Sequence, residues 1–345
     1  MALRNTLSRD PSQPTINISL PSPSKNTPHH LIYFITGNPG LIGYYRAFLE
    51  TLHSLLSDSH TSNITSKDVF DVYGQSLAGF DDTHTVPLSS SKTHPYSLEE
   101  VIDVSLETLE QLRIQQGPRQ GQLYDSVIII GHSVGAYISL EIIQRLKRRK
   151  LPTRITAGIL LFPTVTHIAQ SNSGIKISWL FKIPNFPRIA STVAKLLVSC
   201  APVGVLKWLV GVVTDMPQEG ANVTTAFLKS RMGIWQALHL AEDEMRSITE
   251  DRWDEDIWGV EHKDSDSEVQ APKLIFYFGE NDHWVADHSR DVLIAARGTS
   301  DSENASSKPN MLIDDCEVPH GFCIRHSEVM AEKVRVWVDN IISNP

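Results

Sequence analysis

Residues 131–135 of the chain read Gly-His-Ser-Val-Gly, and this stretch decides the fold that we expect. An apolar run at 127–130 precedes it, and a segment with helical spacing at 136–150 follows it. A Gly-x-Ser-x-Gly motif between a buried strand and a helix is typical of a sharp turn that presents a nucleophilic serine. The sequence therefore predicts a strand, a tight turn with Ser133 at its tip, and a helix.

The two glycines of this motif have a physical role in the expected turn. Ser133 would lie on a strained backbone where strand and helix come close together, so Gly131 and Gly135, two positions away, need to lack a Cβ atom. The helix begins just after the serine, and its free N–H groups and positive dipole end favour a developing oxyanion. We therefore expect the backbone N–H of Val134 to donate to that oxyanion.

Short apolar strands alternate with helices along most of the chain, which predicts an α/β architecture with a mostly parallel sheet covered by helices. We expect strands at about 16–20, 31–36, 69–73, 126–130, 157–162, 273–278 and 311–313, and further helices at about 44–56, 97–115, 285–296 and 327–342. Ser97 and Glu100 have the spacing of a capping box at the start of the helix at 97–115.

The alternation stops after the strand at 157–162 and resumes only near residue 273. The expected organisation is a disordered tail at 1–15, a first part of the α/β core at 16–163, a large helical cap or lid at 164–270, and the second part of the core at 271–345. Acidic residues dominate from 242 to 268, and we interpret this part of the insertion as a solvated helix and linker.

Composition limits the class of protein. With 345 residues, 41% of them hydrophobic, the chain is long enough to bury a large core. Its three cysteines are a sparse, odd set that argues against a disulfide scaffold, and its polar N-terminus predicts no secretory signal. The formal net charge is −9, yet residues 142–214 contain eleven Lys and Arg and no Asp or Glu. A basic, apolar block in an acidic protein indicates an anionic surface as partner, and we expect no nucleic acid.

The apolar segment at 175–213 is interrupted by Pro184, Pro187 and Pro202, and its unbroken pieces are too short for a membrane span of about 20 residues. Its tryptophans and scattered lysines suit segments that lie in the interface of a lipid surface. The residues that we expect to contact lipid are Trp179, Leu180, Phe181, Phe186, Leu196, Leu197, Leu206, Trp208 and Leu209. The alternative is a cap whose apolar faces pack over an active-site pocket, and the two roles are compatible.

A serine hydroxyl becomes a good nucleophile only when a base removes its proton and a third group orients the base. In folds with this serine turn, the chain order is nucleophile, acid, histidine. Asp282 follows the strand at 273–278, and His320 follows the strand at 311–313. The order therefore predicts a Ser133–Asp282–His320 triad that works without a cofactor or a metal ion.

Other residues compete for the roles of acid and base. Glu280 lies close to the strand end, and Asp287 is expected a turn into the next helix and facing away, so Asp282 is better placed. His326 is expected to cap the last helix, and His132 to be held against neighbouring loops.

A second oxyanion donor is expected from the loop that follows the strand at 31–36. Residues 37–40 of this loop read Gly-Asn-Pro-Gly, which also predicts a tight turn. Pro39 has no N–H, so we assign the donor to Asn38, whose side-chain amide offers an additional hydrogen bond.

Further motifs accompany these residues. The full set is Ile-Thr-Gly-Asn-Pro-Gly at 35–40 followed by Tyr44 and Tyr45, Gly-His-Ser-Val-Gly-Ala-Tyr at 131–137, Leu-Phe-Pro-Thr at 161–164 with Ser171 and Gly174, Phe-Gly-Glu-Asn-Asp-His-Trp at 278–284, and His320 with His326 and Ser327 behind it. Together they resemble the lipid droplet-associated hydrolase family over most of residues 30–340. One departure is Thr36, where we expect proline from the family pattern, and this change should leave the oxyanion turn intact.

The resemblance implies an α/β-hydrolase fold, the triad named above, and residence on lipid droplets with weak esterase activity on sterol esters or triacylglycerol. Our leading hypothesis is a serine hydrolase of carboxylic esters that acts on apolar lipids at the droplet surface. It would be peripheral or monotopic and face the cytosol, with the endoplasmic reticulum membrane as a second location. The alternatives are a droplet-binding scaffold with little activity, and a soluble thioesterase or peptidase whose insertion is only an acyl pocket.

Overall fold

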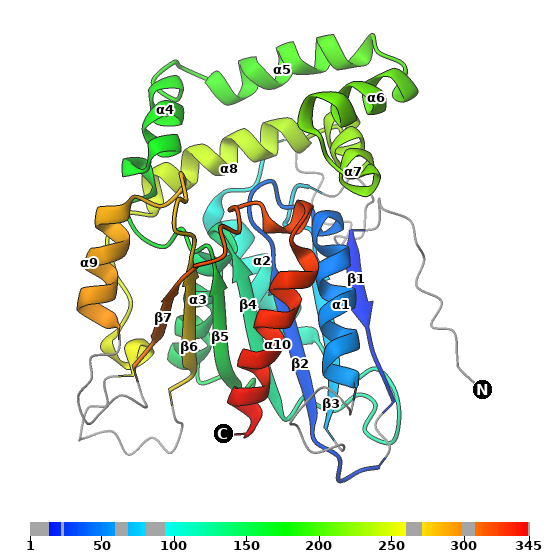
Figure 1. Ribbon diagram of the computed structural model, residues 1–345, viewed down its shortest axis with the longest axis vertical. Coiled ribbons are helices and arrows are strands. Elements are labelled where there is room, and N and C mark those ends of the chain that lie inside the picture. Colours follow the sequence, from blue (N-terminus) through cyan, green and yellow to red (C-terminus); the bar gives the residue numbers. More distant parts are fainter. Residues whose placement is uncertain are drawn as a thin grey trace.

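The computed structural model describes residues 14–21, 24–58, 68–80, 94–259, 271–298 and 308–343. It has a central sheet with helices on both faces and a further layer of helices across one end (Figure 1). The expected tail at 1–15 lies outside the described residues except for its last two, and the acidic linker lies outside them from residue 260.

The sheet confirms the expected α/β architecture. Its strands are β1 (Thr15–Ile18), β2 (His29–Ile35), β3 (Val69–Gln75), β4 (Ser126–His132), β5 (Ile155–Leu161), β6 (Lys273–Phe278) and β7 (Asn310–Ile313). They lie in the order β1-β3-β2-β4-β5-β6-β7, and every neighbouring pair is parallel except β1 with β3. β2 and β4 are buried along their whole length, because parallel strands are covered on both faces.

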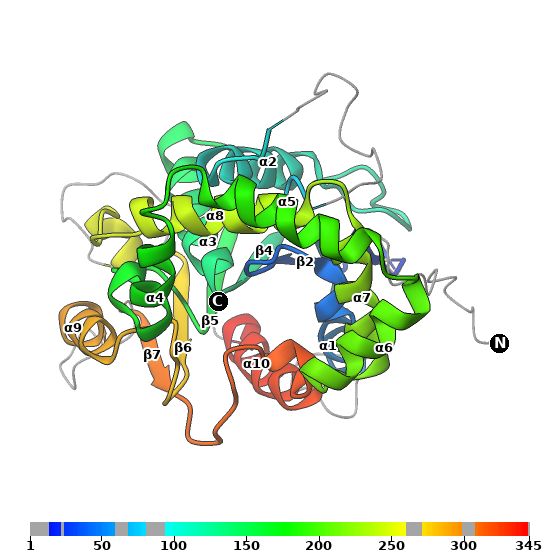
Figure 2. The same cartoon turned by 90° about the horizontal axis from the view of Figure 1, so that it is seen from above.

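Each face of the sheet packs against its own set of helices, since successive strand residues point to opposite faces. One face is covered by α1 (Arg46–Ser57), which follows the 3₁₀ turn Ile42–Tyr45, and by α10 (Ser327–Ser343); the other is covered by α2 (Leu98–Gln111), α3 (Val134–Arg149) and α9 (Asp287–Arg297). Figure 2 shows α1 and α10 on one side of the strands, with α2 and α3 on the other.

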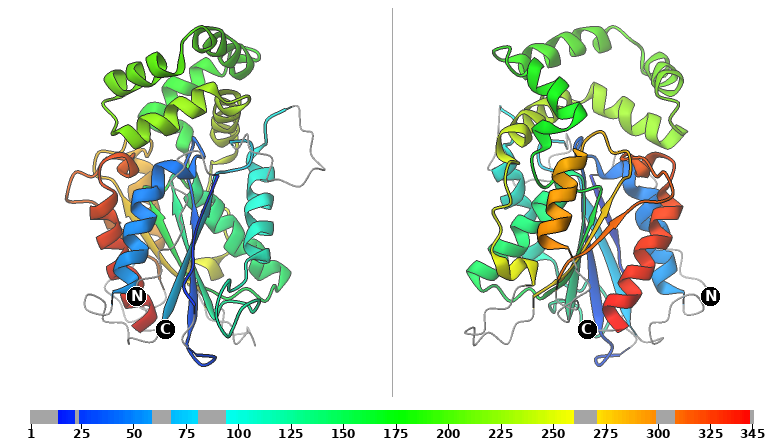
Figure 3. Two further views of the ribbon diagram at one scale, coloured as in Figure 1. Left: turned by 90° about the vertical axis from the view of Figure 1, so that its right-hand side faces the viewer. Right: turned by 60° about the vertical axis from the view of Figure 1, so that its left-hand side comes forward.

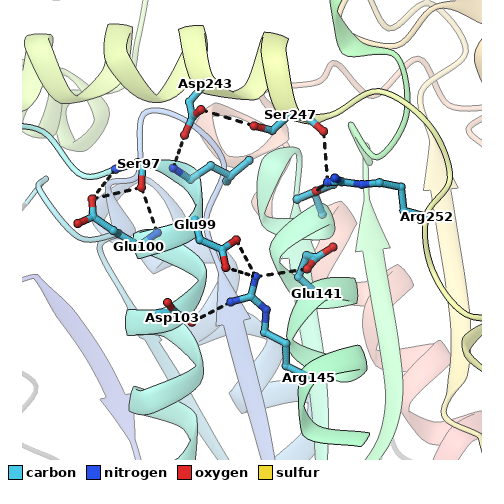
Figure 4. Close-up of polar contacts among 11 residues, drawn as sticks. Ser97, Glu99, Glu100, Asp103, Glu141, Arg145, Asp243, Ser247 and Arg252 are labelled. Carbon is cyan, nitrogen blue, oxygen red and sulfur yellow. Dashed lines mark hydrogen bonds and ion pairs between the residues drawn. The ribbon is translucent and has the colours of Figure 1, made fainter. Parts of the chain in front are cut away.

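Local interactions fix where α2 begins and ends. The Ser97 hydroxyl accepts the N–H of Glu100, and the Glu100 carboxylate accepts the N–H of Ser97, which confirms the predicted capping box (Figure 4). The helix ends at Gln111, earlier than expected, because Ile114 pairs through its backbone with residues 121–122.

Between β5 and β6, the chain forms a helical insertion that covers the carboxyl ends of the parallel strands (Figures 1 and 3). Its helices are α4 (Asn172–Leu180), α5 (Phe186–Ser199), α6 (Val203–Thr214), α7 (Gln218–Lys229) and α8 (Gly233–Ser247), with 3₁₀ turns at Ile168–Gln170 and Glu255–Trp258. Among the described residues, no single helix is long and apolar enough to cross a membrane; α5 and α6 meet that test only together, with a bend of 117° between them.

The insertion has an inner and an outer part. α8 lies next to the core, where Gln236 exchanges two hydrogen bonds with the backbone of Tyr96, and Asp243 accepts the N–H of Leu98 at the start of α2. Figure 4 shows Asp243 directly above this end of α2. α5 and α6 lie farther from the sheet (Figure 1). We call α8 the inner helix, and α5 with α6 the outer pair.

Candidate active site

The turn at residues 131–135 has the close packing that its glycines predict. Ser133 has φ +55° and ψ −122°, a conformation that L residues rarely adopt. A Cβ atom on Gly131 would lie 2.3 Å from the carbonyl oxygen of Gly135, and one on Gly135 would lie 2.4 Å from the carbonyl oxygen of Ile35. The two strands and the helix therefore leave room only for glycine at both positions.

Three loops at the carboxyl ends of β4, β6 and β7 bring Ser133, Asp282 and His320 together. His320 Nε2 lies 3.0 Å from Ser133 Oγ, and His320 Nδ1 lies 2.7 Å from Asp282 Oδ2. The other carboxylate oxygen of Asp282 accepts the N–H of Trp284 at 2.9 Å, which fixes the acid in place. These contacts have the geometry of a nucleophile, a base and an acid that orients the base.

The competing acids Glu280 and Asp287, and the competing base His326, lie outside this cluster. Glu280 is exposed, and Asp287, the first residue of α9, pairs with Arg290 at 2.9 Å. His326 directly precedes α10, and its carbonyl oxygen accepts the N–H of Met330, as expected for the residue that begins a helix.

His132 connects the loops of the site. Its Nε2 lies 2.9 Å from the carbonyl oxygen of His320, and its Nδ1 lies 2.7 Å from Tyr45 Oη. Burial, and then the neighbouring His320, hold the pKa of His132 well below its usual range, so the ring is neutral. A neutral ring that donates its Nε2–H to the carbonyl accepts the Tyr45 O–H at Nδ1, and Tyr45 Oη in turn accepts the N–H of Gly37 at 3.2 Å. A chain of hydrogen bonds thus runs from the Gly37 loop to the His320 loop, and the sequence alone did not reveal it.

The two expected oxyanion donors come from the start of α3 and from the loop after β2. Val134 is the first residue of α3, where backbone N–H groups have no acceptor within the helix. A Cβ atom on Gly37 would lie 3.0 Å from Ser133 Cβ, so the loop packs directly on the serine turn. Because Gly37 donates its N–H to Tyr45 and the residue after Asn38 is proline, Asn38 carries the N–H that this part of the loop offers.

The Asn38 side chain corrects one expectation. Its amide donates to the carbonyl oxygen of Ala237 at 3.0 Å and to Glu244 Oε1 at 2.9 Å, both on α8, so it is not free to bind an oxyanion. Glu244 is buried, which raises the pKa of its carboxyl group to about 8. The sequence interpretation assigns this residue to a solvated helix, but Leu240 and Ile248, four positions before and after it, are buried on the same face. That apolar spacing is the sequence feature that identifies Glu244 as buried.

Among the described residues, one group has possible metal-ligand atoms within 4.8 Å of one another: Asp314, Asp315 and Cys316. The Asp314 carboxylate already accepts the Tyr277 hydroxyl and the backbone N–H groups of Cys316 and Val318. These hydrogen bonds fix the turn after β7, so we assign the group a structural role.

A cavity of about 1090 Å³ lies at the opposite end of the sheet from the serine turn. Its lining includes His30, Ser126, Ile155 and Lys273, which stand at or near the first residues of β2, β4, β5 and β6. Ligands of parallel α/β sheets bind at the carboxyl ends of the strands, where Ser133 lies. The cavity is therefore separate from the candidate active site.

Most of the expected lipid-contact residues are at the surface of the insertion. Those with large exposed fractions are Trp179 (66%), Leu196 (65%), Leu197 (72%), Trp208 (65%) and Leu209 (40%). Leu180, Phe181 and Phe186 are half-buried, and the rings of Phe181 and Phe186 pack edge to face with centroids 6.0 Å apart. The exposed members give α4 and the outer pair an apolar surface.

Leu206 is a correction to the expected lipid-contact set. It is only 7% exposed and packs with Val210 and with Ala221 of α7 in a small cluster of its own. α6 is apolar on nearly every side, so its sequence pattern does not reveal which face another helix covers.

A model of the family described as lipid-droplet associated hydrolase matches residues 28–323. The lipid droplet-associated hydrolase of Gallus gallus is 28% identical over 332 residues, which cover 91% of this chain and 86% of that protein. The protein of the same name from Dictyostelium discoideum is 24% identical over 320 residues, which cover 92% and 91%.

Solved structures show the fold. The juvenile hormone epoxide hydrolase of the silkworm Bombyx mori matches with a TM-score of 0.52 at 13% identity, over 96% of this chain and 73% of that one. A variant of the meta-cleavage product hydrolase CumD matches with a TM-score of 0.51 at 12% identity, over 96% and 94%. With a mostly parallel seven-stranded sheet flanked by helices, the chain has the α/β-hydrolase fold.

Proposed function

The chain belongs to the lipid droplet-associated hydrolase family, and from this premise we propose that it is a serine hydrolase of apolar lipid esters, sterol esters or acylglycerols, at a lipid droplet surface. The observation that carries the proposal is the hydrogen-bonded series Ser133–His320–Asp282, with contacts of 3.0 and 2.7 Å. These side chains and water are sufficient for ester hydrolysis.

In the proposed mechanism, each residue has one role, which the geometry supports. Ser133 Oγ attacks the ester carbonyl while His320 Nε2 takes its proton, and the Asp282 carboxylate holds the Nδ1–H of the resulting imidazolium. The N–H groups of Val134 and Asn38 bind the oxyanion of the tetrahedral intermediate. His320 then gives its proton to the departing alcohol, which leaves an acyl-serine. Water attacks this ester by the same route, releases the fatty acid and restores Ser133.

The apolar surface of α4 and the outer pair would provide contact with lipid. Trp179, Leu197 and Trp208 are each exposed by 65% or more, and an apolar surface of this kind marks an interaction site. Residues 142–214 contain no Asp or Glu, whose negative charges would oppose entry of this segment into a lipid interface. This composition favours a lipid surface over an acidic or basic protein as the partner. α4 and the outer pair would lie in the plane of the droplet monolayer or of the endoplasmic reticulum membrane, and the rest of the protein would face the cytosol.

Hydrolysis by the purified protein tests the proposal. Emulsified cholesteryl oleate, emulsified triolein and a soluble short-chain nitrophenyl ester are compared, with Ser133→Ala as the control. The wild type is expected to release fatty acid at least about 10³-fold faster than the variant on one or more of these esters. Equal release by a folded wild type and Ser133→Ala on all three would overturn the proposal.

A further inference from the structure

The conformation of the oxyanion loop is fixed from outside the α/β core. The side-chain amide of Asn38 has two N–H donors, and both point to α8: one to the carbonyl oxygen of Ala237 at 3.0 Å, the other to Glu244 Oε1 at 2.9 Å. Asn38 is also the residue whose backbone N–H is assigned to the oxyanion. A residue of the insertion therefore holds the side chain of a residue that acts through its backbone.

Glu244 is placed for this contact alone. It is 4% exposed and lies between the buried Leu240 and Ile248 on the inner face of α8. Among the described residues, the hydrogen-bond partner of its carboxyl group is Asn38. The charged group that acts on it is Asp243 of the same helix, and residues 37–40 bring no charged side chain to it. A buried carboxyl group without a cationic partner costs stability, so its presence calls for a role.

The buried Glu244 carboxyl group is not needed to attach α8 to the core, because other residues of α8 make that attachment. Gln236 exchanges hydrogen bonds with both backbone groups of Tyr96, at 2.7 and 2.9 Å, and Asp243 accepts the N–H of Leu98 at 2.6 Å. These contacts join α8 to the backbone at the start of α2 and involve no residue of the oxyanion loop. Removal of the Glu244 carboxyl group should therefore leave α8 attached and leave the Asn38 side chain held only by the carbonyl oxygen of Ala237.

We propose that Glu244 is a positioning residue for ester hydrolysis, which orients the oxyanion N–H of Asn38 through the hydrogen bond between their side chains. The proposal rests on the proposed function, because it concerns the same oxyanion site. It makes the inner helix a working part of the active site and not only a cover over it.

This role has a pH dependence with a definite sign. Burial raises the pKa of Glu244 to about 8, so the group is protonated at neutral pH and its carbonyl oxygen accepts from Asn38. Ionisation above that pKa keeps the hydrogen bond, because a carboxylate accepts an N–H more strongly than a neutral carboxyl group does, but it places a negative charge next to the residue assigned to the oxyanion. This charge opposes the negative charge of the transition state, so kcat should fall as the pH rises through about 8. The unfolded chain releases this proton near 4.5, so folded-state stability should also decline between about 4.5 and 8 and level off above.

The experiment measures kcat and KM of Glu244→Ala, Glu244→Gln, Asn38→Ala and the double variant Glu244→Ala/Asn38→Ala on a soluble ester from pH 6 to about 10. Glu244→Ala is expected to lower kcat at pH 7 by about 10- to 100-fold with KM nearly unchanged, since the loss falls on the transition state. Glu244→Gln keeps a neutral acceptor, so it should keep most of kcat and lose the decline near pH 8. Asn38→Ala removes this contact together with the one to Ala237, so in the double variant the effect of Glu244→Ala should not add to that of Asn38→Ala.

Glu242→Ala is the matched control on the same helix. Glu242 pairs with Arg246 one turn away and should change kcat less than twofold. Fully additive losses in Glu244→Ala and Asn38→Ala, or a kcat of Glu244→Ala within twofold of wild type, would overturn the positioning role. If Glu244→Gln removes the decline in stability with pH but the kcat of the wild type does not fall through about pH 8, Glu244 has a purely structural role and the proposal is overturned. A wild type no faster than Ser133→Ala would instead overturn the proposed function, and this proposal with it.

Discussion

The inner helix and the outer pair belong to one insertion but have opposite surfaces. α8 presents Gln236, Asp243 and Glu244 to polar groups of the core, and each of these side chains has a defined partner. The outer pair presents Leu197 and Trp208, which are exposed by 72% and 65%. In our proposals the difference separates two tasks: the inner side of the insertion would complete the catalytic geometry, and the outer side would contact lipid. Substitutions on one side should therefore leave the other task intact.

The largest separation of catalysis from lipid binding is expected from Asp282→Asn, which should lose activity and keep its binding to droplets. The amide cannot hold the His320 tautomer that accepts the serine proton, so kcat on a soluble ester should fall by about 10⁴-fold. Flotation with lipid droplets should be unchanged, because Asp282 lies under the insertion. Asp287→Asn is the matched control, since that exposed acid contacts Arg290 and not the histidine. Equal losses in the two variants would contradict the assignment of the acid.

The opposite result, weaker lipid binding with catalysis retained, is expected when Trp179, Leu197 and Trp208 are replaced by serine together. Burial of each large apolar side chain contributes about 1.5–3 kcal/mol, so the triple variant should lose at least about 10²-fold in partition onto droplets or vesicles. Its kcat on a soluble ester should remain within twofold. Val292→Ser on α9, also at an exposed apolar position, is the control. Unchanged flotation of the triple variant would exclude α4 and the outer pair as the lipid contact.

Glycines of the serine turn and of the outer pair should respond in opposite ways to alanine. In Gly135→Ala the new Cβ atom meets the carbonyl oxygens of Ile35 and Thr36 at 2.4 and 2.7 Å, so the free energy of unfolding should fall by about 1–3 kcal/mol. Gly211 of α6 has nothing within 4 Å of such an atom, and alanine there should stabilise the helix by up to about 1 kcal/mol. Chemical denaturation of both variants gives the comparison. A shift of the same sign and size in both would show that the serine turn is not closely packed.

The smallest effect concerns charge on the outer side. Lys182 is an exposed cation between α4 and α5, in the stretch that lacks Asp and Glu. Replacing it by glutamine should weaken binding to vesicles that contain anionic lipid by about 1 kcal/mol, roughly fivefold, and the difference should shrink at high salt. Binding that does not respond to salt or to this substitution would mean that apolar contact alone holds the protein.

The sequence was sufficient for the fold because the fold follows local rules. Apolar runs and turn residues predict the alternating strands and helices, and the glycines around Ser133 predict the strand–turn–helix unit. The order of residues along the chain then identified Asp282 as the acid and His320 as the base. The structure brings both to Ser133, although His320 lies 187 residues away in the sequence. The expected helix ends were off by a few residues where a 3₁₀ turn or a backbone pairing intervened.

The contacts between the insertion and the core were beyond the sequence. The Asn38 amide meets Glu244 across a separation of 206 residues, and the burial of Leu206 depends on how α7 lies against α6. No local pattern specifies which residues of a long insertion face a given loop. Likewise, the bonds of His132 to Tyr45 and to the His320 carbonyl require the relative placement of three loops.

Covalent labelling with a fluorophosphonate, followed by mass spectrometry of the labelled peptide, tests the central claim most directly. The probe reacts with an activated serine whatever the natural ester is, so no substrate needs to be assumed. One adduct is expected on Ser133 of the folded wild type, absent in Ser133→Ala and formed far more slowly in Asp282→Asn. A folded, droplet-bound wild type that takes no label, or that is labelled on a residue other than Ser133, would contradict the claim.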